Sequence, residues 1–78
     1  MSLLWIINAK HIVDYKIEIQ FNTNEIAIVN LENHLDKKIF KPLLDKAFFC
    51  NFKLNSWTIE WLNGADFSPE FLYNLPRL

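Results

Sequence analysis

The chain has 78 residues, of which 51% are hydrophobic, 15% aromatic and 22% charged, and its formal net charge is −1. This length leaves room for one domain, and the composition is that of a globular chain rather than a disordered one. A single cysteine excludes an internal disulfide framework, and the longest mainly apolar run, residues 3–7, is far shorter than the ~20 residues that span a bilayer. We therefore expect one small cytoplasmic domain over residues 1–78 that makes no membrane contact.

Two strands are predicted near the N-terminus. Residues 3–13 are rich in Ile, Leu, Val and Trp, and the polar Asn8 favours a bend within them. Apolar and polar side chains alternate through residues 15–21, so that one face is apolar and the other is polar. This alternation is typical of a half-buried antiparallel strand.

A third strand is predicted at residues 25–31, after a turn at 22–24. The turn sequence Asn-Thr-Asn suits a tight reversal, because Asn tolerates the left-handed backbone. Ile26 and Ile28 share one face of this strand, and the opposite face is also apolar. Such a strand is either covered on both faces or available to a partner.

The middle of the chain predicts a short helix near residues 40–49. Pro42 suits the start of a helical turn, because its missing N–H costs no hydrogen bond there. The spacing of the following apolar residues would let them cover a face of the sheet, and these residues are Leu43, Leu44, Ala47 and Phe48.

The C-terminal third predicts a hairpin and a final helix. The hairpin joins residues 52–54 to 57–61, with one face made of Trp57, Ile59 and Trp61 and the other of Thr58 and Glu60.

A turn follows the hairpin at Asn63-Gly64, because the only glycine of the chain suits a positive φ. A helix at 68–75 then begins with an N-cap serine, a proline and an acidic residue. Together these elements predict an α+β fold, a small antiparallel β-sheet with short helices.

Residues that could carry catalysis or bind a metal are scattered. His11 and His34 form no metal-ligand spacing with Cys50, and the aromatic neighbours of Cys50 predict a buried, inert thiol. One glycine cannot build a phosphate-binding loop. We therefore expect no catalytic residue, no metal site and no cofactor.

Nucleic-acid binding is not favoured either, because the most basic segment is interrupted by acidic residues. Its four lysines and two aspartates give +2 in total: Lys37, Lys38, Lys41, Lys46, Asp36 and Asp45.

Three other residues have two interpretations each. Trp5 and Trp57 could be core residues, or anchors of an interface, where Trp is enriched. Asp66 could accept backbone N–H groups and fix its loop, or it could bind a ligand. For Asp66 we favour the structural role.

Residues 58–66, Thr-Ile-Glu-Trp-Leu-Asn-Gly-Ala-Asp, followed by Ser-Pro-Glu-Phe-Leu-Tyr at 68–73, resemble the hallmark of the domain of unknown function 2442 family. The segment Phe-Lys-Pro-Leu-Leu-Asp at 40–45, with Phe49, is similar to a second element of that family. The resemblance implies a bacterial α+β domain without a characterised function. Some relatives are encoded beside a second small protein, in an arrangement similar to that of toxin–antitoxin pairs.

We therefore expect a non-enzymatic protein-interaction domain. It would be the antitoxin-like or regulatory partner of another small protein, or would form a homo-oligomer. The expected contacts are Trp5, Ile26, Ile28 and Trp57, and the residues expected to shape the loop are Trp61, Asn63, Gly64 and Asp66. The alternative is a sensor domain that binds a small ligand in a pocket lined by the loop at 61–66.

Overall fold

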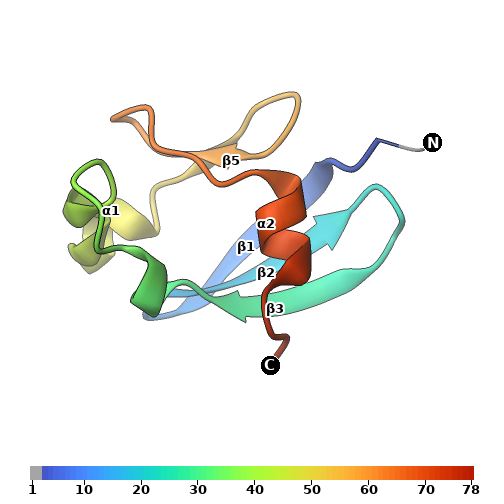
Figure 1. Ribbon diagram of the computed structural model, residues 1–78, viewed down its shortest axis with the longest axis horizontal. Helices are drawn as coiled ribbons and strands as arrows, with labels where there is room; N and C mark the ends of the chain where they lie inside the picture. Colours follow the sequence, from blue (N-terminus) through green and yellow to red (C-terminus); the bar gives the residue numbers. More distant parts are fainter. Residues whose placement is uncertain (1–2) are drawn as a thin grey trace.

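The computed structural model describes residues 3–78, and its centre is a three-stranded antiparallel sheet. Its strands are β1 (Ile6–Val13), β2 (Lys16–Phe21) and β3 (Ile26–Asn30), in the order β1-β2-β3, which makes β1 and β3 the edges. A short antiparallel pair, β4 (Lys53–Leu54) and β5 (Ile59–Glu60), lies alongside β1 (Figure 1).

Four short helical segments complete the fold. Two are 3-10 helices, η1 (Glu32–His34) and η2 (Lys41–Leu44), and two are α-helices, α1 (Lys46–Phe49) and α2 (Pro69–Asn74). In Figure 1, α2 crosses the sheet, and the chain after it ends next to β3. The predicted α+β fold is confirmed.

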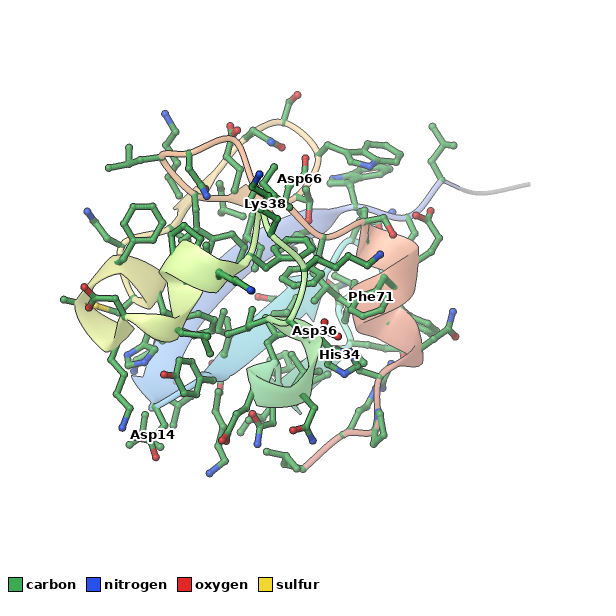
Figure 2. The ribbon with its side chains drawn as sticks, turned by 60° about the vertical axis from the view of Figure 1, so that its left-hand side comes forward. Asp14, His34, Asp36, Lys38, Asp66 and Phe71 are labelled. Atoms are coloured by element: carbon green, nitrogen blue, oxygen red, sulfur yellow. The ribbon has the colours of Figure 1, made fainter. Side chains whose placement is uncertain are left out.

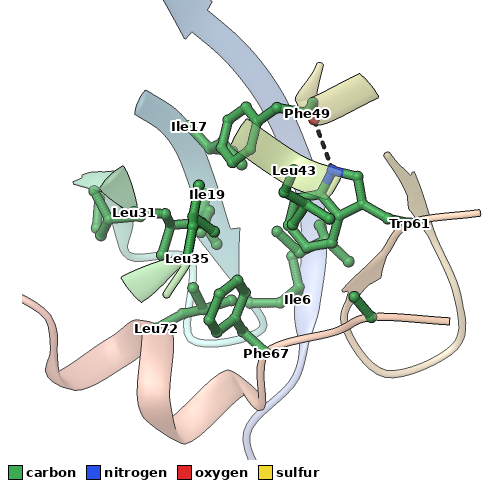
Figure 3. Packing of buried hydrophobic residues seen from close by; sticks show 14 of the residues in the cluster. Ile6, Ile17, Ile19, Leu31, Leu35, Leu43, Phe49, Trp61, Phe67 and Leu72 are labelled. Carbon is green, nitrogen blue, oxygen red and sulfur yellow. Dashed lines mark hydrogen bonds between the residues drawn. The ribbon is translucent and has the colours of Figure 1, made fainter. Parts of the chain in front are cut away.

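The core lies on one face of the sheet, as the alternation in residues 15–21 predicts. Ile17, Ile19 and Phe21 are fully buried, and their neighbours Ala27 and Val29 on β3 are buried beside them. Figure 3 shows side chains from other elements packed on this face, among them Leu31, Leu35, Leu43, Phe49, Trp61, Phe67 and Leu72.

The two edge strands differ in regularity. The pairing of β1 with β2 shifts register twice, between Ile6 and Asn8 and between His11 and Val13. The first shift coincides with the bend expected near Asn8. The pairing of β2 with β3 has no such shift, so β3 is the regular edge.

The prediction for residues 40–49 is partly wrong. Leu43 is fully buried as expected, but Leu44 and Ala47 are exposed, and Phe49 is the other buried residue. The segment is not one helix, because Asp45 has an extended backbone and separates η2 from α1. Two single turns with a break between them place different residues inward than a continuous helix would.

Thr58 is buried together with Ile59 and Trp61, although it was predicted on the hairpin face opposite to theirs. Its hydroxyl donates to the carbonyl of Phe67 at 2.7 Å, which satisfies the polar group inside the core. Cys50 is exposed, although its aromatic neighbours suggested burial. It ends the single turn of α1 and so points away from the core that Phe49 enters.

Candidate functional site

The loop after β5 is held by its own backbone and by the side chain of Asn63. The N–H of Gly64 donates to the Trp61 carbonyl, and the N–H of Trp61 donates to the Ala65 carbonyl, both at 2.9 Å. Gly64 has φ +85°, which confirms the predicted positive φ. The side chain of Asn63 accepts from the Ala65 N–H at 3.2 Å and donates to the Ile39 carbonyl at 2.9 Å.

Asp66 does not have the structural role expected from the sequence. Within residues 3–78 its carboxylate makes no hydrogen bond or ion pair, and only its backbone pairs with Glu60. Asn63 supplies the side-chain acceptor instead, because an Asx-type bond two residues along the chain closes this turn. The Asp66 side chain is therefore exposed and could contact a ligand or a partner.

A pocket of about 290 Å³ opens next to Asp66, between the segment at 34–40 and α2. Figure 2 shows the labelled residues His34, Asp36 and Phe71 close together, with Asp66 at the other end of the same face. The complete lining is His34, Asp36, Lys37, Phe40, Asp66, Phe67, Ser68 and Phe71.

Stacked aromatic rings form the wall of this pocket. The ring centroids of Phe40 and Phe67 are 4.5 Å apart and those of Phe67 and Phe71 are 5.3 Å apart, with nearly parallel planes. The charges of the lining are mixed, since two aspartates face one lysine. The pocket can therefore hold a small polar or aromatic group. Its mixed charges favour neither an anionic nor a cationic ligand.

The β3 edge is the second candidate surface. Its hydrogen-bonded pairs with β2 begin at Tyr15–Leu31 and end at Phe21–Glu25. Because such pairs alternate along an antiparallel ladder, the backbone groups of the residues between them in β3 point alternately toward β2 and away from it. The outward groups belong to Ile26, Ile28 and Asn30, and these three residues define the β3 edge.

The C-terminal segment, residues 76–78, covers part of this edge. The N–H of Leu78 donates to the outward carbonyl of Ile28 at 2.9 Å. The guanidinium of Arg77 lies 3.2 Å from the carboxylate of Glu25 and 4.8 Å from the ring centroid of Tyr73. The segment thereby occupies one of the outward backbone groups of β3.

Glu25 is the anchor of this contact. The hydroxyl of Tyr73 donates to its carboxylate at 2.8 Å and Arg77 binds the other oxygen. The hydrogen bond from Tyr73, followed by that from Arg77, lowers the pKa of Glu25 below its ordinary value. A second surface pair joins Lys46 to Asp14 at 3.0 Å, and its hydrogen bond lowers the pKa of Asp14.

The four expected contact residues lie on two parts of the surface. Trp5 and Trp57 are 38% and 39% exposed, and the Trp57 carbonyl accepts from the N–H of Ile6, beside Trp5. Ile26 is 57% exposed and Ile28 is partly exposed on the other edge of the sheet. The sequence left open whether the two tryptophans are core or surface, and both keep a substantial exposed fraction.

Of the residues expected to shape the loop, Trp61 is a core residue. It is 1% exposed, and its indole N–H donates to the Phe49 carbonyl at 2.7 Å. The sequence did not indicate His34, Asp36 or Ser68 as pocket residues. No local pattern could have done so, because the lining comes from two segments far apart in the chain, residues 34–40 and 66–71.

Two general findings concern residues 3–78. No group of three His, Cys, Asp or Glu side chains in this range could hold a metal ion. No helix in the described part of the chain has both the length and the apolar character needed to cross a bilayer.

Comparison with known proteins adds one match. Neither the curated proteins nor the solved structures contain a match to this chain. A family model does match residues 6–76, which cover nearly all of the fold described above, including the β3 edge, the pocket and the loop after β5. The chain belongs to the family described as protein of unknown function (DUF2442).

Proposed function

We propose that this chain is a non-enzymatic protein-interaction domain of the bacterial cytoplasm. It acts as the antitoxin-like or regulatory member of a two-protein module, or associates with itself. The observation that carries the proposal is the β3 edge, where Ile26 is 57% exposed beside outward backbone groups. Exposed apolar edge strands promote association, and natural proteins generally blunt or cover them.

The mechanism is strand addition. An extended segment of the partner would pair with the outward N–H and C=O groups of β3, and its side chains would contact Ile26 and Ile28. The regular register of β3 suits such pairing. The opposite edge suits it less, because the pairing of β1 with β2 carries two register shifts.

The outer face of the sheet does not by itself make a large apolar surface. Ile26 lies opposite Gln20 and Ile28 lies opposite Glu18 in the β2–β3 register. The apolar side chains therefore form a stripe along β3 rather than a patch across the sheet. A stripe of this shape supports edge pairing over face-to-face docking.

A matched pair of double variants tests the surface. Ile26→Lys with Ile28→Lys should abolish association and leave the monomer folded, because both side chains lie on the solvent side of the sheet. The control is Ile7→Lys with Ile12→Lys on β1, where the side chains are 43% and 42% exposed. Retained association in the β3 variant, or its loss in the control alone, would place the interface elsewhere.

The pocket favours a second candidate function, a sensor domain for a small ligand. Asp66, from the loop expected to line such a pocket, is part of its lining, and the volume of about 290 Å³ is at the lower end of the range for ligand sites. The ring centroids of Trp61 and Phe67 are 5.9 Å apart, and Phe67 is part of the pocket wall. A ligand that shifts Phe67 would change the surroundings of Trp61, so tryptophan fluorescence would report binding. A flat fluorescence response across a panel of metabolites would count against this function.

A further inference from the structure

The pocket beside Asp66 has charged groups at both of its ends. His34 and Asp36 lie close together at one end, and Asp66 lies at the other (Figure 2). No three His, Cys, Asp or Glu side chains in the described part of the chain are grouped so that they could hold a metal ion, so these three side chains do not converge on one point. The two carboxylates can therefore accept hydrogen bonds from two separate groups of one ligand.

An aromatic wall connects the two ends. The ring of His34 meets that of Phe71 edge-on, with centroids 5.2 Å apart. Phe71 stacks on Phe67, the residue that follows Asp66 in the chain, and Phe67 stacks in turn on Phe40. Aromatic side chains of this kind pack favourably against a further planar ring. The wall therefore suits a ligand whose aromatic body reaches from one carboxylate toward the other.

Lys37 brings a positive charge to the same lining, next to Asp36 in the sequence. Within residues 3–78, the side chains of Lys37, Asp36 and Asp66 take part in no hydrogen bond or ion pair. Neighbouring groups of opposite charge match the α-ammonium and α-carboxylate of an amino acid, which one carbon atom joins, and both contacts would be charge-assisted hydrogen bonds. This end of the pocket is therefore complementary to a zwitterion.

Other ligand classes fit the lining less well. A wholly apolar ligand would take water from two carboxylates and a lysine and offer them no new partner. A phosphorylated ligand would gain one lysine but would be repelled by two carboxylates. The volume of about 290 Å³ is at the lower end of the range for ligand sites, which favours a single amino acid over a nucleotide.

We propose that this pocket binds a free amino acid whose aromatic ring carries a hydrogen-bond donor, as the ring of tyrosine does. The α-ammonium binds Asp36 and the α-carboxylate binds Lys37. The ring packs against the aromatic wall, and its distal donor reaches Asp66. This inference deepens the second candidate function, the small-ligand sensor, and rests on it for the use of the pocket.

Four probes that differ by single groups test this ligand class. The first is L-tyrosine, and each of the others lacks one of its groups: L-phenylalanine the ring hydroxyl, tyramine the carboxylate and hydroxyphenylpropionate the ammonium. NMR titration of the isotope-labelled native chain measures each affinity and identifies the amides that shift. Tyrosine should bind most tightly. Each of the others should bind roughly tenfold more weakly, because each has lost one hydrogen bond to a charged side chain.

Single variants connect each group of the ligand to one residue. Asp66→Asn should reduce the preference for tyrosine over phenylalanine, Lys37→Gln its preference over tyramine, and Asp36→Asn its preference over hydroxyphenylpropionate. All three side chains are exposed, so the variants should stay folded. Lys38→Gln and Glu70→Gln are the matched controls, because they remove the same charges from exposed residues outside the lining and should leave all the preferences unchanged.

The outcomes separate this inference from the sensor function on which it rests. Tyrosine that does not bind, four probes that bind equally, or preferences that the three lining variants leave unchanged would each overturn the amino-acid ligand. If another metabolite then shifted amides of residues 34–40 and 66–71, the sensor function would stand with a different ligand class. Tyrosine binding that shifts these two segments and loses one preference in each lining variant establishes the inference.

Discussion

The indole N–H of Trp61 donates to the carbonyl of Phe49 at 2.7 Å inside the core (Figure 3). This bond ties the loop after β5 to the last residue of α1, two segments that share no strand pairing. The two aromatic rings also pack against each other, with centroids 5.6 Å apart. Trp61 therefore links the loop after β5 to α1, both by a hydrogen bond and by the packing of its buried ring.

Replacing Trp61 by Phe should destabilise the domain by about 2–4 kcal/mol, because the Phe49 carbonyl loses its donor and a cavity remains. Urea unfolding followed by circular dichroism measures the change. Trp57→Phe is the matched control, and we expect it to cost less than about 1 kcal/mol because this side chain is half-exposed. Equal costs at the two positions would contradict the assigned role of Trp61.

Gly64→Ala should destabilise the domain by about 1–2 kcal/mol through backbone strain alone. The residue has φ +85°, and an added Cβ would meet no atom within 4 Å, so crowding contributes nothing. Gly64→Asn should cost less, since Asn tolerates positive φ. Thermal unfolding of both variants tests this, and a larger loss for Asn than for Ala would contradict it.

Glu25 should contribute to the loss of stability in acid. Its pKa is lowered from the ordinary 4.5 in the folded state, so its contribution is fully present above about pH 4.5 and is lost as the pH falls through the folded pKa. Glu25→Gln should therefore lose less stability between pH 7 and pH 3 than the native chain. Urea midpoints at both pH values measure this, and parallel losses would contradict it.

The source of the shift can be tested separately. Tyr73→Phe removes the largest cause of the low pKa and should raise the pKa of Glu25 toward its ordinary value. Arg77→Met removes both a hydrogen bond and a charge, and it should also raise this pKa. Side-chain carboxyl NMR of Glu25 gives the two titration curves, and an unchanged pKa in either variant would contradict the role of the residue replaced.

The sequence predicted those parts of the fold that depend on local pattern. Alternation alone identified the buried face of β2, and the Ser68 N-cap, whose side chain accepts from the Phe71 N–H at 3.1 Å, was evident from Ser-Pro-Glu. Both are determined within a few residues of the chain. The turn at Gly64 is another such case.

The sequence failed where a distant contact decides the outcome. Thr58 faces inward because its hydroxyl donates a hydrogen bond to the buried Phe67 carbonyl. Nothing near Thr58 in the sequence indicates that this acceptor will lie beside it. The contact of Leu78 with Ile28 joins the end of the described chain to β3 and has no local signal either. The pocket at Asp66 belongs to the same class, since its walls come from separate segments.

The most direct test of the interaction domain is co-expression of the tagged native chain with the products of its adjacent genes, followed by light scattering on the purified material at high concentration. We expect a mass above that of the monomer, either a stoichiometric complex with a second protein or a dimer of this chain. A chain that purifies alone and remains a monomer at millimolar concentration would contradict the proposed interaction domain and leave the small-ligand sensor as the better explanation.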